Sequence, residues 1–76
     1  MILDIIVNKS DDGFTAEIPS LNGCETWNAN EDSVITEIVL LAKYYLNISA
    51  ESKHKIDKAS VKSSRSNYKL IIDKNV

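Results

Sequence analysis

Four carboxylates near the start of the chain come closest, in type and spacing, to a catalytic arrangement. Asp4 lies in one apolar run, Glu17 lies in a second, and Asp11 and Asp12 lie in the polar segment between them. If the two runs are neighbouring strands, these oxygens form a candidate magnesium site, because hard cations prefer carboxylate ligands. Acids in turns and on exposed faces are much commoner, so we expect no catalytic residue, no metal ligand and no cofactor site.

Two residues with distinctive side-chain chemistry, Cys24 and His54, each occur once in the chain. One cysteine excludes an internal disulfide, and one cysteine with one histidine cannot complete a structural zinc site. A nucleophilic Cys24 needs a basic neighbour, whereas the adjacent Glu25 raises a thiol pKa. His54 lies among lysines, so we expect it to be exposed and without a specific partner.

Alternation of apolar and polar residues predicts the strands that carry these side chains. Residues 2–9 are rich in β-branched residues and apolar on both faces, as in a central strand. Residues 10–13 form a turn signal, and residues 14–18 alternate like a half-buried antiparallel strand. Pro19 ends that strand because it cannot donate to the ladder, and residues 24–28 form a short third strand.

One amphipathic helix is predicted over residues 31–46. Asn30 is a good N-cap, and apolar residues recur at helical spacing from Val34 onwards. Asn47 is expected to stop the helix at its C-terminal end. Residues 68–73 then read as the last strand.

The connection between the helix and the last strand, residues 46–67, has little apolar pattern. Serine and lysine dominate it, so a poorly ordered linker, a short helix over residues 50–58 and a strand near residues 58–63 all remain open. The chain of 76 residues fits one domain, residues 1–76.

The predicted order is β-β-β-α-β, an α+β fold with one antiparallel or mixed sheet and a helix on one face. A right-handed crossover through the helix predicts that the last strand is parallel to the first. Ile2, Ile6 and Ile71 then lie on the sheet face away from the helix. Because that face is too apolar to leave in water and the core is small, we expect a homodimer or a higher homo-oligomer.

Charge divides the sequence into an acidic body and a basic segment. Residues 1–51 carry two lysines against nine carboxylates, a net charge of -7. Residues 53–69 carry six cations against Asp57 alone, a net charge of +5. An acidic body suits a basic partner, whose approach long-range attraction accelerates, while the alternative is two solvated surfaces.

The sequence is not typical of a membrane-spanning or secreted protein. No apolar run approaches the roughly 20 residues that span a bilayer, and Met1 to Asp4 lack the basic region of a signal peptide. A single cysteine suits a reducing compartment, so we expect a cytoplasmic protein without a membrane partner.

The stretch from Thr15 to Thr26, which contains Pro19 and the pair Gly23 and Cys24, resembles the signature of the HicB-like antitoxin family. That signature is a strand ending in proline, a short loop to Gly-Cys and an acidic, capped helix start. The resemblance covers residues 2–46, although Asn30 stands where the family usually has threonine. Beyond residue 47 the chain lacks the helical pair with which many members repress their own operon.

The resemblance implies a partial ribonuclease-H-like fold without nuclease chemistry. It also implies a partner, a small basic HicA-type toxin that cleaves mRNA and whose active or RNA-binding surface the antitoxin covers. We expect the partner to bind Glu25, Trp27, Glu31 and Asp32, whose three acids are close in sequence and are expected to form one patch.

Two other functions remain open from the residues. One is a nucleic-acid-binding regulator that uses the basic segment, although no RNA-binding aromatic pair or glycine-rich phosphate loop accompanies its lysines. The other is a remnant nuclease that uses Asp4 and Glu17.

Overall fold

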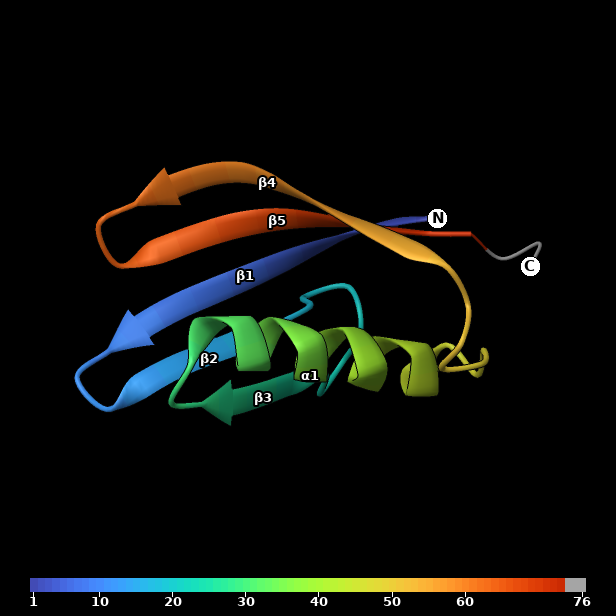
Figure 1. Cartoon of the computed structure of the whole chain (residues 1–76), viewed down its shortest axis with the longest axis horizontal. Coiled ribbons are helices and arrows are strands. Elements are labelled where there is room, and N and C mark those ends of the chain that lie inside the picture. Colours follow the sequence, from blue (N-terminus) through green and yellow to red (C-terminus); the bar gives the residue numbers. More distant parts are fainter. Residues whose placement is uncertain (74–76) are drawn as a thin grey trace.

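The computed structural model describes residues 1–73 of the chain, which form a small α+β fold. Three strands, one helix and two more strands follow one another (Figure 1). They are β1 (Ile2–Ser10), β2 (Gly13–Glu17), β3 (Glu25–Asn28), α1 (Glu31–Tyr45), β4 (His54–Lys62) and β5 (Arg65–Ile72). The hairpin, the short third strand, the single long helix and the last strand are therefore confirmed.

The predicted order β-β-β-α-β lacked one strand, because β4 lies within the connection over residues 46–67. Of the three alternatives left open there, the strand near residues 58–63 is right in kind, although β4 begins four residues earlier, and the linker and the short helix over residues 50–58 are wrong. β4 is an edge strand, and of its nine residues only Ile56 is more than superficially covered. With both faces polar, the strand lacks the apolar alternation from which strands are recognised.

All neighbouring strands of the five-stranded sheet are antiparallel, in the order β3-β2-β1-β5-β4. The prediction that the last strand is parallel to the first is therefore wrong: Ile2 opposes Ile71 and Val7 opposes Ser66 in an antiparallel register. The crossover through α1 ends instead in β4, at the far edge of the sheet (Figure 1). A tight turn then returns the chain as β5, which pairs with β1.

The ends of α1 confirm the capping residues predicted for it. The Asn30 side chain accepts a hydrogen bond from the Ser33 backbone N–H at 3.1 Å, which satisfies one free donor of the first turn. Asn47 adopts a left-handed backbone with φ 57°. The Ile48 N–H then donates to the Lys43 carbonyl at 3.0 Å, a Schellman closure that ends the helix.

The core lies between α1 and the sheet face that it covers. From the sheet come alternate residues of the strands, and from the helix comes its apolar stripe. The buried members are Ile5, Val7, Ala16, Tyr68, Leu70 and Ile72 of the strands, Val34, Ile38, Val39 and Ala42 of the helix, and Ile18 and Cys24 at the two ends of the β2–β3 loop. Each fully buried Ile, Leu or Val side chain contributes about 1.5–3 kcal/mol, so this layer holds the elements in place.

The opposite sheet face, which we call the open face, is not covered by any element among residues 1–73. Ile2, Ile6 and Ile71 lie on it, as predicted, because Leu3 and Leu70 beside them point to the helix. Ile2 is 64% exposed. The fold therefore leaves an apolar centre on one side of its sheet.

Candidate functional site

Glu25 and Trp27, two of the four predicted partner-binding residues, lie on the open face. They alternate along β3 with Thr26 and Asn28, whose side chains both donate to the Glu37 carboxylate of α1. Since successive strand residues point to opposite faces, Glu25 and Trp27 point away from the helix. β3 is also an edge strand, so these two side chains lie at the margin of the molecule.

The indole of Trp27 packs over the turn that joins β1 to β2. A Cβ atom added to Gly13 would lie 2.7 Å from the Trp27 ring and 2.7 Å from the Asn28 carbonyl oxygen. Only glycine fits beneath the ring in this position. Trp27 is nevertheless 48% exposed, so much of its surface is available to a partner.

Glu31 and Asp32, the other two predicted residues, lie in the first turn of α1 on the opposite side of the sheet. The Glu31 carboxylate accepts a hydrogen bond from the Tyr68 hydroxyl at 3.2 Å, on the helix-covered face, while Asp32 is exposed. The prediction that Glu25, Glu31 and Asp32 form one patch is therefore wrong. Residues close in sequence are divided by the strand alternation and by the turn into the helix.

Burial and the neighbouring Glu31 carboxylate both raise the pKa of Tyr68 above its ordinary value. The phenol thus stays protonated and donates to Glu31, while the Lys58 ammonium lies 5.5 Å above the centre of the Tyr68 ring. These contacts join the start of α1 to the β4–β5 hairpin. They also give Glu31 a structural role that exposed Asp32 does not have.

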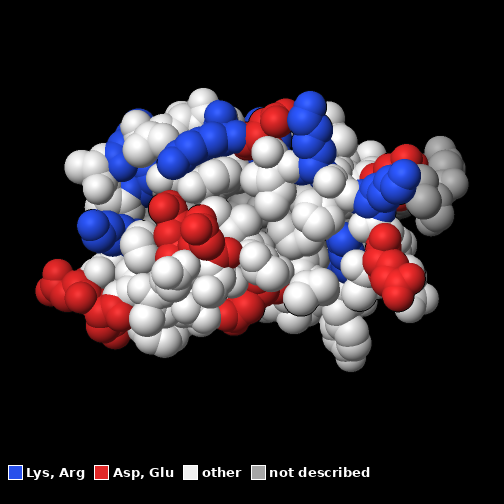
Figure 2. Space-filling view, in the orientation of Figure 1, with Lys and Arg blue, Asp and Glu red and all other residues white. Residues whose placement is uncertain are grey.

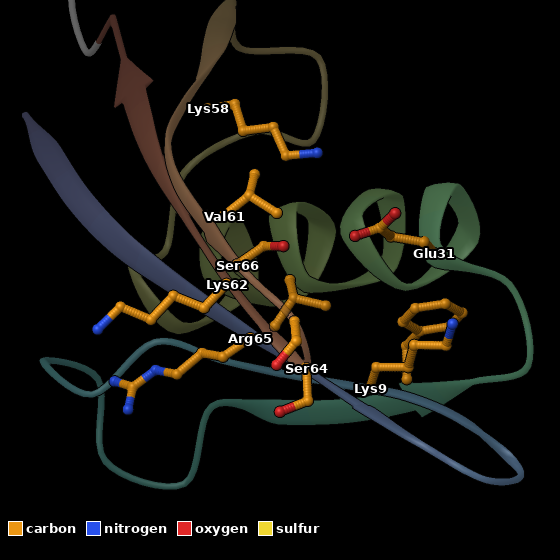
Figure 3. Close-up of a pocket in the computed structure, with 11 residues that line it drawn as sticks. Lys9, Glu31, Lys58, Val61, Lys62, Ser64, Arg65 and Ser66 are labelled. Atoms are coloured by element: carbon orange, nitrogen blue, oxygen red, sulfur yellow. The ribbon is translucent and has the colours of Figure 1, made fainter.

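A hollow of about 200 Å³ lies between the start of α1, the end of β1 and the β4–β5 hairpin (Figure 3). Its basic lining residues are Lys9, Lys58, Lys62 and Arg65. Figure 3 shows Lys58 reaching towards Glu31, while Lys62 and Arg65 extend away from the helix. The cations of the basic segment are thus divided between the two sheet faces, and the hollow itself contains a carboxylate.

The division of charge along the sequence is also a division in space. Figure 2 shows the acidic side chains mainly over the part of the molecule built by β2, β3 and α1. Lysine and arginine gather over β4 and β5. At one end of the acidic part, Asp11 and Asp12 are exposed in the β1–β2 turn and Asp32 is exposed at the start of α1.

The four carboxylates considered as a metal site do not converge. Asp4 forms an ion pair with Lys69 of β5, and Glu17 opposes Ile6 rather than Asp4. Asp11 and Asp12 lie beyond the other end of β1, about 20 Å from Asp4 at the rise of an extended strand. Within residues 1–73, no group of three or more His, Cys, Asp and Glu side chains is placed to hold a metal ion.

Lys43 is a distinctive residue that sequence reasoning missed. Its side chain is only 2% exposed, and its ammonium donates to the carbonyl oxygens of Ser52 at 2.6 Å and Ala50 at 3.2 Å. The same Nζ lies 2.9 Å from Nδ1 of His54, which is exposed as expected but not without a partner. The signal was present: Lys43 follows Val39 by four residues on the apolar stripe of the helix.

Cys24 is buried, and burial raises the pKa of its thiol. The predicted direction was right, but the cause is desolvation and not the adjacent Glu25. A buried thiol that holds its proton more tightly is a packing residue.

No helix among residues 1–73 is both long enough and apolar enough to cross a membrane. Comparison of the chain with family models, with curated proteins and with solved structures found no match in any of the three.

Proposed function

We propose that this chain is an antitoxin-type binding protein that neutralises a small basic toxin of the HicA type. The observation that carries the proposal is the acidic part of its surface, built by β2, β3 and α1 (Figure 2). The motif from Thr15 to Thr26 supplies the identity of the partner, since it resembles the HicB-like signature. The unit β1–β2–β3–α1 supports a partial ribonuclease-H-like assignment, while the β4–β5 hairpin departs from it.

The surface that we assign to the toxin is the acidic end, defined by Asp11, Asp12 and Asp32. All three are exposed, and among the described residues 1–73 only Asp12 has a side-chain partner, the Ser10 hydroxyl at 2.8 Å. Fully hydrated carboxylates of this kind act at long range, because they steer an oppositely charged partner before contact. An RNA-cleaving toxin must itself present cations to phosphate, so an acidic protein surface competes with RNA for the same groups.

The proposed mechanism is occlusion. The acidic end covers the basic RNA-binding surface of the toxin, and no bond is made or broken. Such a contact has a kinetic signature: rim charges act mainly on the association rate, and salt weakens that effect.

The test measures association with a HicA-type toxin by stopped flow at low and at high salt. The double variant Asp11→Lys/Asp32→Lys should slow association at least tenfold at low salt. The control Glu51→Lys/Asp57→Lys makes the same change in net charge at exposed positions away from the acidic end, and it should change the rate much less. Equal rates for the two variants would show that the acidic end is not the docking surface. No binding to any such toxin, and no rescue of growth on co-expression, would remove the proposal itself.

A further inference from the structure

The open face carries its charges in two halves on either side of its central strand. The strand registers decide which side chains point there. On the β2–β3 side the charged residues are Glu17 and Glu25. On the β5–β4 side they are Lys69, Arg65, Lys55 and Lys62, with Asp57 the single acid. One half is therefore acidic and the other is basic, while the central strand β1 carries one acid on this face, Asp4, which forms an ion pair with Lys69 of β5.

Apolar side chains lie between and beside these halves. Ile2 and Ile6 of β1 lie with Ile71 of β5 in the middle of the face, and Trp27 lies at its acidic margin. Figure 1 shows no helix on this side of the sheet. A centre of three isoleucines around one internal ion pair, with a charged margin on each side, is closer to the composition of an interface than to that of a solvated surface.

A two-fold axis makes this face complementary to itself. β1 is the middle strand of the five, with β2 and β3 on one side and β5 and β4 on the other. Rotation about an axis along β1 lays β2 and β3 of one copy over β5 and β4 of the other. The acidic half of each copy then lies over the basic half of the other, and this contact occurs twice, as in an isologous interface.

We propose that two copies of this chain stack open face against open face about an axis along β1. In this arrangement Ile6 of each copy lies at the centre, and Asp4 of each copy lies against Asp4 of the other with its charge balanced by its own partner Lys69. Trp27 of each copy faces Arg65 and Lys62 of the other, because the axis preserves position along the strands. A cation over the face of an indole is attracted to it. Glu17 and Glu25 lie in the next row of paired residues across the sheet, so they are also near Arg65 of the other copy.

The other in-plane two-fold axis gives the opposite result. An axis perpendicular to the strands would lay β3 over β3 and β4 over β4. Acid would then oppose acid and base would oppose base, which is unfavourable across an interface. Charge therefore selects one of the two face-to-face arrangements.

The open face also contains an unfilled acceptor. A hollow of about 360 Å³ on this face is lined in part by Asp4, Ile6, Asn67 and Lys69. The Asn67 side-chain oxygen is buried there and has no hydrogen-bond partner within residues 1–73. Buried acceptors are almost always paired, so we expect a donor from a second copy to bind the Asn67 oxygen. The Ser20 hydroxyl on the rim of the hollow and the Trp27 indole N–H are donors that each copy supplies.

The size of the face is sufficient for a stable dimer. The molecule measures 38 × 20 × 20 Å, and its strands run along the long dimension (Figure 1). A face of that length and width is close to the roughly 800 Å² that each partner of a standard interface buries.

The test is a charge swap followed by sedimentation equilibrium at micromolar concentration. The wild-type chain should have twice its monomer mass of 8.5 kDa. Glu17→Lys/Glu25→Lys makes both halves basic, and Lys62→Glu/Arg65→Glu makes both halves acidic, so each variant alone should be monomeric. An equimolar mixture of the two should recover the dimer. The control Asp11→Lys/Glu51→Lys changes exposed acids of the β1–β2 turn and the loop after α1, and should remain dimeric.

A monomeric wild-type chain would overturn the proposal, and so would dimeric single variants or a mixture that stays monomeric. Circular dichroism of each variant shows whether it is folded. If a variant is unfolded, the wild-type protein still decides: its dimer dissociation constant should rise about tenfold from low to high salt as the charges are screened. No rise would contradict the charge-selected stacking. The toxin takes no part in this test, so its outcome is independent of the proposed function.

Discussion

Lys43 offers the sharpest test of how this small fold is held together. Lys43→Met keeps the length of the apolar stem and removes the ammonium, so packing against α1 and β4 is largely retained. What is lost is the pair of charge-assisted hydrogen bonds to Ser52 and Ala50. Those bonds fix the loop that leads from α1 into β4. Within residues 1–73, no side chain of that loop makes a hydrogen bond to the helix that could replace them.

The expected loss of stability follows from the groups left behind. A hydrogen bond from a charged donor contributes about 1.5–3 kcal/mol, and a buried carbonyl left unpaired costs about 1–3 kcal/mol. Ser52 is 8% exposed, so its carbonyl is poorly placed to recover a water, whereas Ala50 is exposed and its carbonyl recovers one. We therefore expect about 2–4 kcal/mol, a large share of the stability of a chain this short.

Urea denaturation followed by circular dichroism measures this loss as a shift of the midpoint at constant slope. The matched control is Lys53→Met, which makes the same chemical change at an exposed position and should alter stability by less than about 0.5 kcal/mol. If Lys43→Met matches that control, the buried ammonium does not hold the loop, and the α1–β4 connection must be fixed by other contacts.

Three further changes test other parts of the fold by the same urea midpoint. Asn30→Ala removes the N-cap and should lower the free energy of unfolding by about 1 kcal/mol, whereas an unchanged midpoint would show that the cap does not contribute to stability. Gly13→Ala places a Cβ 2.7 Å from the Trp27 ring and should lower the free energy of unfolding by more than about 1 kcal/mol. It should also change the indole fluorescence, whereas the control Asp12→Ala should not. Folding raises the pKa of Cys24 and Tyr68 from ordinary values of 9.0 and 10.0, so their protonated forms are favoured in the folded state. Stability should thus fall as pH rises through 9 and 10, and Cys24→Ala/Tyr68→Phe should flatten that fall.

The parts of the fold that the sequence predicted are those in which local chemistry and burial agree. Strand β2 is half-buried, so its alternation is clear, and Asn30 and Asn47 act through their own backbone geometry. β4 was largely missed because an edge strand has almost nothing to bury. The direction of the last strand was then wrong as a consequence, since it depends on whether a strand intervenes between α1 and β5.

The candidate site was less predictable because faces are set by tertiary structure. Glu25 and Glu31 are six positions apart in sequence and lie on opposite sides of the sheet. Lys43 looked like an ordinary surface lysine on a helix, because the carbonyls that hold it come from a loop without pattern. Both errors concern the side of the fold to which a side chain points, which is settled only when the strands, the helix and the loop after it pack together.

The separation of the acidic residues has a consequence for both proposals. In the proposed dimer, Glu25 and Trp27 on the open face lie in the contact between copies, whereas Asp11 and Asp32 at the acidic end stay accessible to the proposed basic partner. One surface therefore does not have to serve two partners. Because the axis along β1 preserves position along the strands, the two acidic ends lie at the same end of the dimer. Two toxin molecules would then dock side by side, and reversal of Glu17 and Glu25 should abolish the dimer while leaving toxin association measurable.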